Sequence, residues 1–435
     1  MSRVTLGVVL IALVTVPTRT APAQATPRRD TLRLRDLQEA AARVDPREQQ
    51  LALQRQSTAL RLRTLAAERL PALSGDGTAQ YQSVVTTIPI RLPNVSVPTP
   101  PNDKFDAHLD AQQRILDPSL GARADVERAN LGLAEARLRT TVYGLRGEVN
   151  DAFFSAALAQ ARAGALTAAI SDLEAQLRVA RARVREGTAL PSEAATLEAE
   201  LLSRRQDLDD LGATRVASLA VLATLTSRSI AATDTLLLPD LATAVASARA
   251  TVPRDRPEYL QFARTREQLA AQERVVASQT RPRVSAFGRA GYGKPGLDFL
   301  ANGFNSYWLA GVEVQWTPWS WGSTDRDREV LALQQQIVAS DEAAFTAATQ
   351  RAVERQLADI DRLTAALRTD DAIIALRERI ERETRHRYEE AVVTAAEYVD
   401  RENDVLAARL TRAGHEVELA QAQARYLTTI GMELR

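Results

Sequence analysis

The chain of 435 residues contains no cysteine and hardly any lysine. Without cysteine there is no disulfide framework, no thiolate metal site, no cysteine nucleophile and no lipid anchor on an N-terminal cysteine. Arginine supplies nearly all of the positive charge, since Lys104 and Lys294 are the only lysines, and the formal net charge is zero. A neutral chain argues against a nucleic acid partner, because binding to phosphates requires a basic surface.

Catalytic and metal-binding motifs are missing as well. The three histidines, His108, His386 and His415, do not stand in a metal-binding spacing such as H-E-x-x-H. Neither a G-x-S-x-G motif nor a P-loop occurs, and the glycine-rich segment 288–293 is better explained as a strand of small residues. We therefore expect no enzyme, no cofactor and no metal site, with His108 facing solvent or an aqueous interior from the polar face of a strand.

Only one long apolar run is present, and it lies at the N-terminus. Residues 4–16 are apolar almost throughout, follow Arg3, and precede small residues in an A-x-A pattern at 21–25. A run of about 13 residues is shorter than the roughly 20 that cross a bilayer. Residues 1–25 therefore predict a secretory signal peptide, with a membrane anchor as the alternative. We expect no transmembrane helix in the rest of the chain.

The remaining chain contains one pattern twice. Pro46 and Pro71 recur as Pro257 and Pro282, both at a separation of 211 residues, whereas segment 185–193 recurs at a separation of 204. The difference predicts a net deletion of seven residues in the second copy, in the loop between its strands. We interpret residues 26–236 and 237–435 as two structural repeats, each ordered helix, strand, loop, strand, long helix, turn, helix.

Each repeat contains one very long predicted helix. Residues 119–186 and 323–390 are free of proline, and a helix of that length reaches roughly 100 Å. Apolar residues at 166, 170, 173, 177, 180 and 184 follow the spacing of a heptad seam, which buries one stripe against another helix. Hairpin tips are expected at 187–193 and 391–397, followed by helices that extend to about 227 and 433.

Short segments of alternating polarity precede both long helices. The four predicted strands lie at about 72–85, 105–116, 283–292 and 306–317. Strands that are apolar on one face and polar on the other, with tryptophan near their ends, are typical of a membrane β-barrel with an aromatic girdle. All four tryptophans fall in this region: Trp308, Trp316, Trp319 and Trp321. A soluble hairpin with one buried face is the alternative.

Four strands cannot close a barrel in lipid, where open sheet edges are not tolerated. If the strands lie in a membrane, other subunits must complete the barrel. Twelve strands from three chains are a natural solution, with the helices continuing the tube as coiled-coil pairs.

Several motifs resemble the TolC-like outer-membrane efflux protein family. They are the segment 32–40 followed by Asp45-Pro46, the Leu-Pro-x-Leu-Ser motif that begins at Leu70, and the segment 316–322. The resemblance implies a mixed, mainly α fold, in which a long coiled-coil helical barrel continues a transmembrane β-barrel of four strands per chain. It implies a homotrimer in the outer membrane of a Gram-negative type of bacterium, in contact with outer-membrane lipid and extending into the periplasm.

The same resemblance implies the function of a passive exit duct for a tripartite efflux or type I secretion system. A periplasmic membrane-fusion adaptor would be the direct partner, and an inner-membrane pump of the RND, ABC or a similar class would be an indirect one. A periplasmic coiled-coil structural or adaptor protein without a channel is the alternative, but it leaves the strand pairs and the clustered tryptophans unexplained. The cargo is not predicted by the sequence.

Resemblance to the family also assigns roles to the hairpin tips. Residues expected to dock the adaptor are Gly187, Thr188, Ala189, Leu190, Ala391, Val392, Val393 and Thr394. Glu397 and Asp400 match acidic residues that form rings in the pore, and Tyr388 and Glu193 match partners that hold the closed state. Ala391 replaces the glycine of the second turn, and Val393 replaces an arginine of the lock, so we expect an incomplete lock that Arg385 or Arg387 could complete.

Overall fold

The protein is described by a computed structural model in which residues 30–86, 99–249, 255–298 and 302–433 are placed. The signal peptide predicted at 1–25 lies outside these residues. In the first half of the chain the elements are β1 (Thr31–Arg33), α1 (Leu34–Val44), α2 (Arg47–Ala67), β2 (Ala72–Tyr81), β3 (Asp103–Leu116), α3 (Pro118–Arg185) and α4 (Pro191–Thr226). In the second half they are β4 (Thr235–Leu237), α5 (Ala242–Ala248), α6 (Pro257–Ser278), β5 (Arg283–Lys294), β6 (Asn305–Gln315), α7 (Ser323–Glu389) and α8 (Ala395–Ile430).

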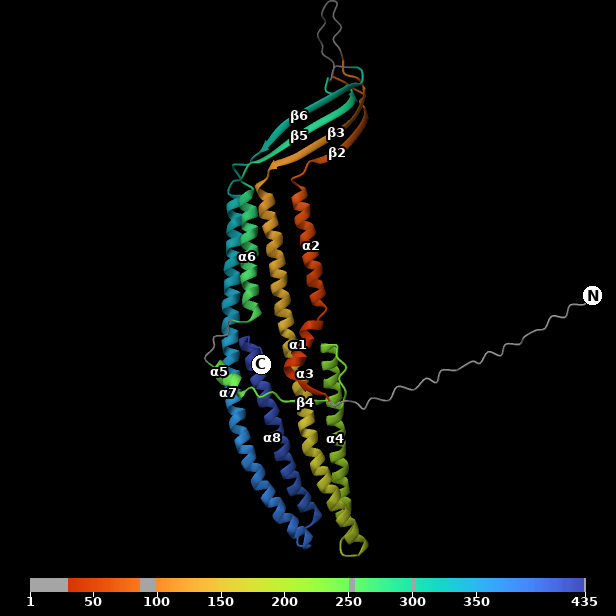
Figure 1. The fold of residues 1–435 in the computed structure, drawn as a ribbon, viewed down its shortest axis with the longest axis vertical. Coiled ribbons are helices and arrows are strands. Elements are labelled where there is room, and N and C mark those ends of the chain that lie inside the picture. The colour runs from red at the N-terminus through yellow and green to blue at the C-terminus, as the bar shows by residue number, and fades with distance from the viewer. Residues whose placement is uncertain (1–29, 87–98, 250–254, 299–301, 434–435) are drawn as a thin grey trace, which may run out of the picture.

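The elements form a long, narrow molecule with a sheet at one end and two helical hairpin tips at the other (Figure 1). Next to the sheet, contacts order the helices as α2, α3, α6 and α7, and toward the tips as α4, α3, α8 and α7. The element order of residues 31–226 recurs in residues 235–430. The first strands of the two halves, β1 and β4, pair in parallel near the middle of the molecule.

The four long strands form an antiparallel sheet in the order β2-β3-β5-β6. Register places alternate residues of all four strands on one face, which we call the apolar face, with Leu73, Leu109, Ala290, Trp308 and Val312 among its members. This face is exposed, since Leu109 retains 67% and Trp308 77% of its accessible surface. A soluble protein normally covers the apolar face of a sheet with its core and exposes the polar face to water. In this single chain the apolar face is the uncovered one.

The opposite face, which we call the polar face, carries ionic and hydrogen-bonded side chains. Arg289 donates to both carboxylate oxygens of Asp110, at 2.7 and 3.0 Å, and the Tyr307 hydroxyl donates to Asp106 at 2.6 Å. Within the described residues the edge strands β2 and β6 each pair on one side only. One chain therefore presents a sheet with two open edges, one apolar face and one polar face.

Strand ends differ by a few residues from those predicted. The strand predicted at 72–85 ends at Tyr81, and Gln82 and Asn102 bond to each other just beyond it. The strand predicted at 306–317 ends at Gln315, and the Trp316 indole donates to the Thr280 carbonyl at 3.0 Å as the chain leaves the sheet.

The tryptophans lie at both ends of β6. Trp308 projects from the apolar face near the start of the strand, whereas Trp316, Trp319 and Trp321 follow its other end. All four are exposed, and the Trp319 and Trp321 rings meet edge to face at 5.8 Å. Eight residues of strand separate the first two tryptophans by about 26 Å along the chain.

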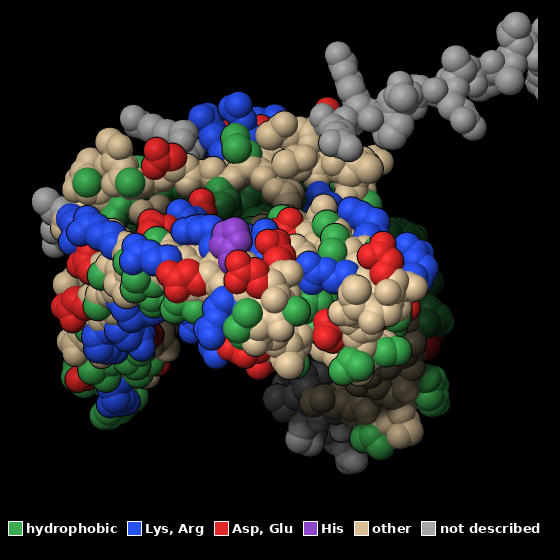
Figure 2. Space-filling model, turned by 90° about the horizontal axis from the view of Figure 1, so that it is seen from below, with side chains coloured by type: hydrophobic (Ala, Val, Ile, Leu, Met, Phe, Trp, Pro, Cys, Tyr) green, Lys and Arg blue, Asp and Glu red, His purple; other side chains and the backbone are tan. Residues whose placement is uncertain are grey.

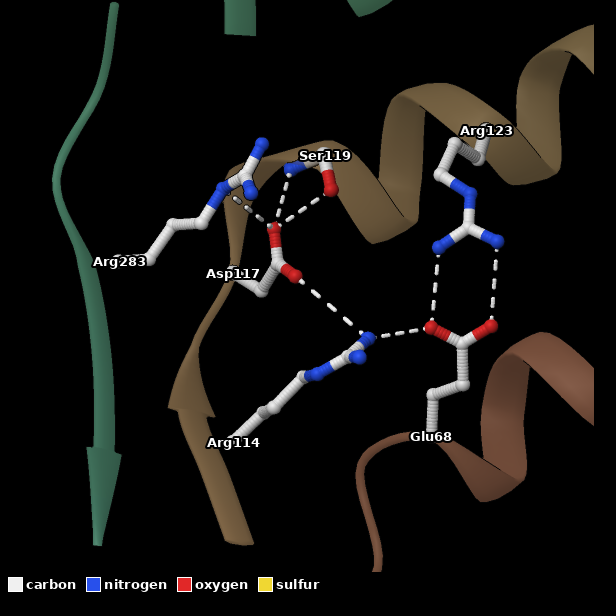
Figure 3. A network of polar contacts seen from close by, with 6 residues as sticks. All are labelled: Glu68, Arg114, Asp117, Ser119, Arg123 and Arg283. Atoms are coloured by element: carbon white, nitrogen blue, oxygen red, sulfur yellow. Dashed lines mark hydrogen bonds and ion pairs between the residues drawn. The ribbon is translucent and has the colours of Figure 1, made fainter. Parts of the chain in front are cut away.

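A network of charged residues joins the sheet to the helices (Figure 3). Asp117 caps α3 by accepting from the Ser119 backbone N–H at 2.9 Å, and Pro118 occupies the first helical position. Arg123 binds Glu68 at the end of α2 through two bonds of 2.9 and 3.1 Å. Arg114 from β3 also binds Glu68 and lies 3.8 Å from Asp117, so one network links β3, α2 and α3.

Two hydrophobic cores lie along the helices. The first is a belt at mid-height where β1, α1, β4 and α5 wrap around α3, α4, α7 and α8, with Phe153, Phe154 and Tyr426 fully buried. The second lies toward the tips and contains the predicted heptad positions Leu166, Ile170, Leu173, Leu177 and Ala180, all buried. The heptad prediction is thereby confirmed for these residues, whereas Val184 at the end of the seam is half-buried.

By length and composition alone, α3 contains a stretch that could cross a membrane, contrary to the expectation of no such helix. Part of this apolar stretch, 44%, is buried inside the structure. Because α3 supplies residues to both cores, we interpret its apolar character as that of a core helix.

Candidate functional site: the tips of the two helical hairpins

The first tip is a short turn between α3 and α4. The Thr188 N–H bonds to the Arg183 carbonyl at 2.9 Å and the Gly187 N–H bonds to the Val184 carbonyl at 3.1 Å. These two bonds form a Schellman motif, which places Gly187 in the left-handed region at φ 70°. Pro191 then begins α4, so the turn is shorter than the predicted segment 187–193.

The second tip repeats this geometry without the glycine. The Val392 N–H bonds to the Arg387 carbonyl at 2.8 Å and the Ala391 N–H bonds to the Tyr388 carbonyl at 3.0 Å. Ala391 adopts φ 60°, so the same Schellman motif forms with a residue that carries a Cβ atom. The side chain of Thr394 then caps α8 by accepting from the Glu397 N–H at 3.3 Å, and the helix begins at Ala395.

We expect Ala391→Gly to stabilise the second tip by about 1 kcal/mol, because an L-residue in the left-handed region is strained by roughly that amount. Gly187→Ala is the matched variant at the first tip, where a Cβ atom would meet nothing within 4 Å. It is expected to destabilise by a similar amount. Chemical denaturation of the wild type and both variants measures the changes in the free energy of unfolding. Equal stabilities for Ala391→Gly and the wild type would contradict the proposal that Ala391 is strained.

The residues predicted to dock a partner lie on these two turns. Gly187, Thr188, Leu190, Ala391, Val392 and Thr394 are exposed, and Ala189 and Val393 are half-buried. Each turn exposes one large apolar side chain, Leu190 at 66% and Val392 at 62%. Seen from below, this end of the molecule forms an arch on which acidic and basic side chains alternate with apolar ones (Figure 2).

The predicted lock residues do not form a hydrogen bond with each other. Tyr388 is 3% exposed, and its ring stacks on that of Tyr398 with centroids 5.4 Å apart. Its hydroxyl has no hydrogen-bond partner within the described residues. Burial and, to a lesser extent, the Glu193 carboxylate raise the pKa of Tyr388, so Glu193 lies near enough to act electrostatically. Within the single chain, aromatic stacking on Tyr398 holds the ring of Tyr388.

An arginine of the first hairpin contacts the second hairpin near the tips. Arg183 donates to the backbone carbonyls of Tyr388 at 3.4 Å and Glu389 at 2.9 Å. These carbonyls end α7, where a cation is favoured by the helix dipole. Arg385, one of the two arginines expected to complete the lock, binds Glu381 within its own helix at 2.8 Å. Arg183 was not singled out by its sequence context.

Glu397 and Asp400 lie one turn apart near the start of α8, and both side chains are exposed. Neither takes part in an ion pair in the described part of the chain, and the intervening Tyr398 and Val399 are buried. The two acids therefore share the helix face that points away from the core.

A buried arginine ties the two hairpins together above the tips. Arg204 of α4 is 1% exposed and donates to Glu402 of α8 at 3.0 Å and to Asn403 at 2.8 Å. It also donates to Glu200 at 3.1 Å and to the Ala169 carbonyl of α3 at 3.3 Å. One side chain thus binds three helices of both hairpins.

The sequence contains a signal for this contact that we did not use. Leu197, Leu201, Arg204 and Leu208 are spaced 4-3-4, so the arginine occupies a seam position of α4. Ala395, Val399 and Glu402 follow the same spacing on α8. A charged residue in each of two apolar seams indicates a buried charge that needs a partner on a facing helix.

Glu402 is the member of this pair whose charge is disfavoured by burial. Burial raises its pKa above the ordinary value, against the lowering effect of Arg204, and the Glu381 and Asp172 carboxylates raise it further. Its second carboxylate oxygen is buried and has no hydrogen-bond partner within the described residues. The ionised form therefore depends on Arg204 for its compensation.

Comparison with known proteins supports the architecture. A family model described as outer membrane efflux protein matches residues 31–228. Among solved structures, the chain is similar to CusC at 16% identity, with 92% of each chain covered and a TM-score of 0.71. It is also similar to VceC of Vibrio cholerae, at 15% identity over 92% of this chain and 97% of that one, with a TM-score of 0.67.

A third similar structure is the outer membrane channel CmeC of Campylobacter jejuni, at 15% identity over 92% of this chain and 85% of that one, with a TM-score of 0.65. At such identities the structural likeness establishes the fold. No curated protein matches the chain at a significant level. The mainly helical fold and the twin hairpins agree with the match of residues 31–228 to the outer membrane efflux protein model.

Proposed function

We propose that this chain is one subunit of a homotrimeric outer-membrane exit duct, a passive conduit that serves a tripartite efflux or type I secretion system. The observation that carries the proposal is the sheet, whose apolar face is exposed and whose two edges are unpaired within the described residues. In lipid both features are accounted for, because the apolar face contacts acyl chains and the edges pair with neighbouring chains.

Both sides of the helical layer support a trimer. Large apolar side chains are exposed on α2, which flanks one side next to the sheet, and on α7, which flanks the other. Toward the tips, α4 and α7 take these places (Figure 1). The exposed residues are Leu53 and Leu60 on α2, Leu202, Val216 and Val221 on α4, and Val330, Leu333, Ile337, Ile373, Leu376 and Ile380 on α7. A neighbouring copy on each side covers these residues in a closed ring of three chains.

The dimensions support a location in the outer membrane with an extension through the periplasm. α3 and α7 contain 68 and 67 residues, so each reaches about 100 Å. The tryptophans Trp308, Trp316, Trp319 and Trp321 bracket the sheet as an aromatic girdle at the two interfaces of the bilayer. The hairpin tips then lie farthest from the membrane, where the adaptor and, through it, the inner-membrane pump engage them.

A periplasmic structural or adaptor protein without a channel is the competing function. It requires that the apolar face of the sheet be covered by protein, and no described residue covers it. Fractionation separates the two functions, because an exit duct is recovered from the outer membrane as a trimer that dissociates on heating. Recovery as a soluble periplasmic protein would reject the proposal.

Within the proposed channel, Glu397 and Asp400 form rings of negative charge at the tip end and make it selective for cations. We expect Glu397→Ala combined with Asp400→Ala to shift the reversal potential of trimers in planar bilayers, measured in a KCl gradient, toward zero. Asp209→Ala combined with Asp210→Ala removes two exposed acids from α4 and serves as the control. If both double variants change selectivity equally, Glu397 and Asp400 are not the filter.

A further inference from the structure

Three side chains of the polar face converge in a way that neither the family match nor the proposed conduit explains. They are Asp76 of β2 and His108 and Asp110 of β3, and one ligand atom of each lies within 4.8 Å of the others. Register accounts for the meeting, because Asp76 pairs directly with His108 and Asp110 is the next residue of β3 on the same face.

The imidazole of His108 has a defined orientation. Its Nδ1 atom lies 2.5 Å from Asp106 Oδ2, and Asp106 is held in turn by the Tyr307 hydroxyl at 2.6 Å. With Nδ1–H donated to Asp106, the Nε2 atom faces Asp110 Oδ2 at 3.2 Å and Asp76 Oδ2 at 3.9 Å. Nε2 and both carboxylate oxygens are acceptors in this tautomer, so a cation can bind between them.

We propose that Asp76, His108 and Asp110 bind a first-row divalent cation of the zinc type. A tetrahedral zinc ion with bonds of about 2.0–2.2 Å places its ligand atoms roughly 3.3–3.5 Å apart, close to the separations of 3.2 and 3.9 Å present before binding. Nε2 of His108 and one oxygen from each aspartate are three ligands, and water completes the fourth position. Asp106 supplies the carboxylate that commonly orients a metal-binding histidine through its other nitrogen.

Charges around the site are compatible with a cation. Asp76, Asp106 and Asp110 surround His108, and the side chain of Asp76 is 61% exposed, which leaves a path from solvent. Arg289 opposes the cation from β5, because it donates to Asp110 Oδ1 at 2.7 Å and to Oδ2 at 3.0 Å. A carboxylate oxygen has two lone pairs, so Oδ2 can accept from Arg289 and still bind the cation. The arginine thereby fixes the carboxylate plane of one ligand.

Equilibrium dialysis of the purified, chelator-treated protein against Zn²⁺ alone tests the site. We expect one tightly bound Zn²⁺ per chain, no comparable binding of Mg²⁺, which prefers oxygen ligands, and loss of the site in His108→Ala. Asp106→Asn is expected to weaken binding by about 10- to 100-fold, as second-shell changes do. His386→Ala, which removes an exposed histidine at the other end of the molecule, is the matched control and retains binding.

Asp76→Asn is the variant least expected to disturb folding, because Asp76 is an exposed residue of an edge strand and, among the described residues, its only ion pair is with His108. This variant is expected to fold as the wild type does and to lose most of the affinity. Equal Zn²⁺ binding by the wild type, His108→Ala and Asp76→Asn, or no binding by the wild type, would overturn the site. The dialysis does not require a channel, so its outcome is independent of the proposed conduit.

Discussion

Arg204→Ala is expected to destabilise the tip end of the molecule by about 3–5 kcal/mol, because it leaves Glu402 buried without its counter-charge. Arg204 is 1% exposed and Glu402 is 7% exposed, so water does not replace the lost partner. The effect reaches α3 and α4 of the first hairpin and α8 of the second, since Arg204 bonds to all three. Hydrogen exchange of the tip segments, combined with chemical denaturation, measures the loss.

Removing both charges is the matched comparison. In Arg204→Met combined with Glu402→Leu no buried charge is left unpaired, so most of the stability is expected to return. A double variant as unstable as Arg204→Ala would show that the arginine acts through packing and not through Glu402.

The sign of the pH dependence at this site follows from the raised pKa of Glu402. The free energy of unfolding contributed by this group is fully present below its unfolded pKa and is lost as the pH rises through its higher folded pKa. The facing charged groups are Arg204, Asp172 and Glu381, and they remain in Glu402→Gln. Glu402→Gln is expected to reduce the pH dependence of the free energy of unfolding between the unfolded and folded pKa of Glu402. If the pH dependence is unchanged in this variant, other groups cause it.

Leu109→Arg is expected to destabilise the membrane-inserted protein by roughly 2–4 kcal/mol, the cost of placing arginine at the lipid face of a barrel. Leu109 lies on the apolar face near the middle of β3 and is 67% exposed in the single chain. The measurements are the amount of heat-dissociable trimer in the outer membrane and the free energy of refolding into lipid vesicles.

Gln112→Arg is the control for this substitution, because Gln112 is an exposed residue of the same strand on the polar face. It adds the same side chain where an aqueous interior is expected, so insertion is expected to remain close to that of the wild type. If the two variants lose equal amounts of inserted trimer, the apolar face does not contact lipid and the polar face does not contact water. The membrane barrel would then be rejected.

Local patterns in the sequence carried the prediction of helices, strands and faces. The heptad pattern predicts which side of α3 is buried, and Leu166, Ile170 and Leu173 are buried as predicted. Alternation of polarity states which residues of a strand share a face, and Leu109 and Asp110 indeed lie on opposite faces of β3. Such patterns can be recognised in the sequence because the period of a helix or strand determines which of its residues share one face.

Turn geometry at Ala391 could not be read in the same way. Glycine at 187 signals a left-handed residue, whereas alanine at 391 gives no such signal. The structure places both in the same motif, because the hydrogen bonds of the helix end and the packing of Tyr388 against Tyr398 over-determine the second turn.

Partner choice was decided by the tertiary structure alone. Arg204 and Glu402 are 198 residues apart, and Asp76 reaches His108 only through the register of β2 on β3. The sequence by itself determined that a neutral, cysteine-free chain folds into long seamed helices and strands with one apolar face. Which charged side chains meet across those elements depends on their relative register and packing, and a pattern confined to one element contains no information on either.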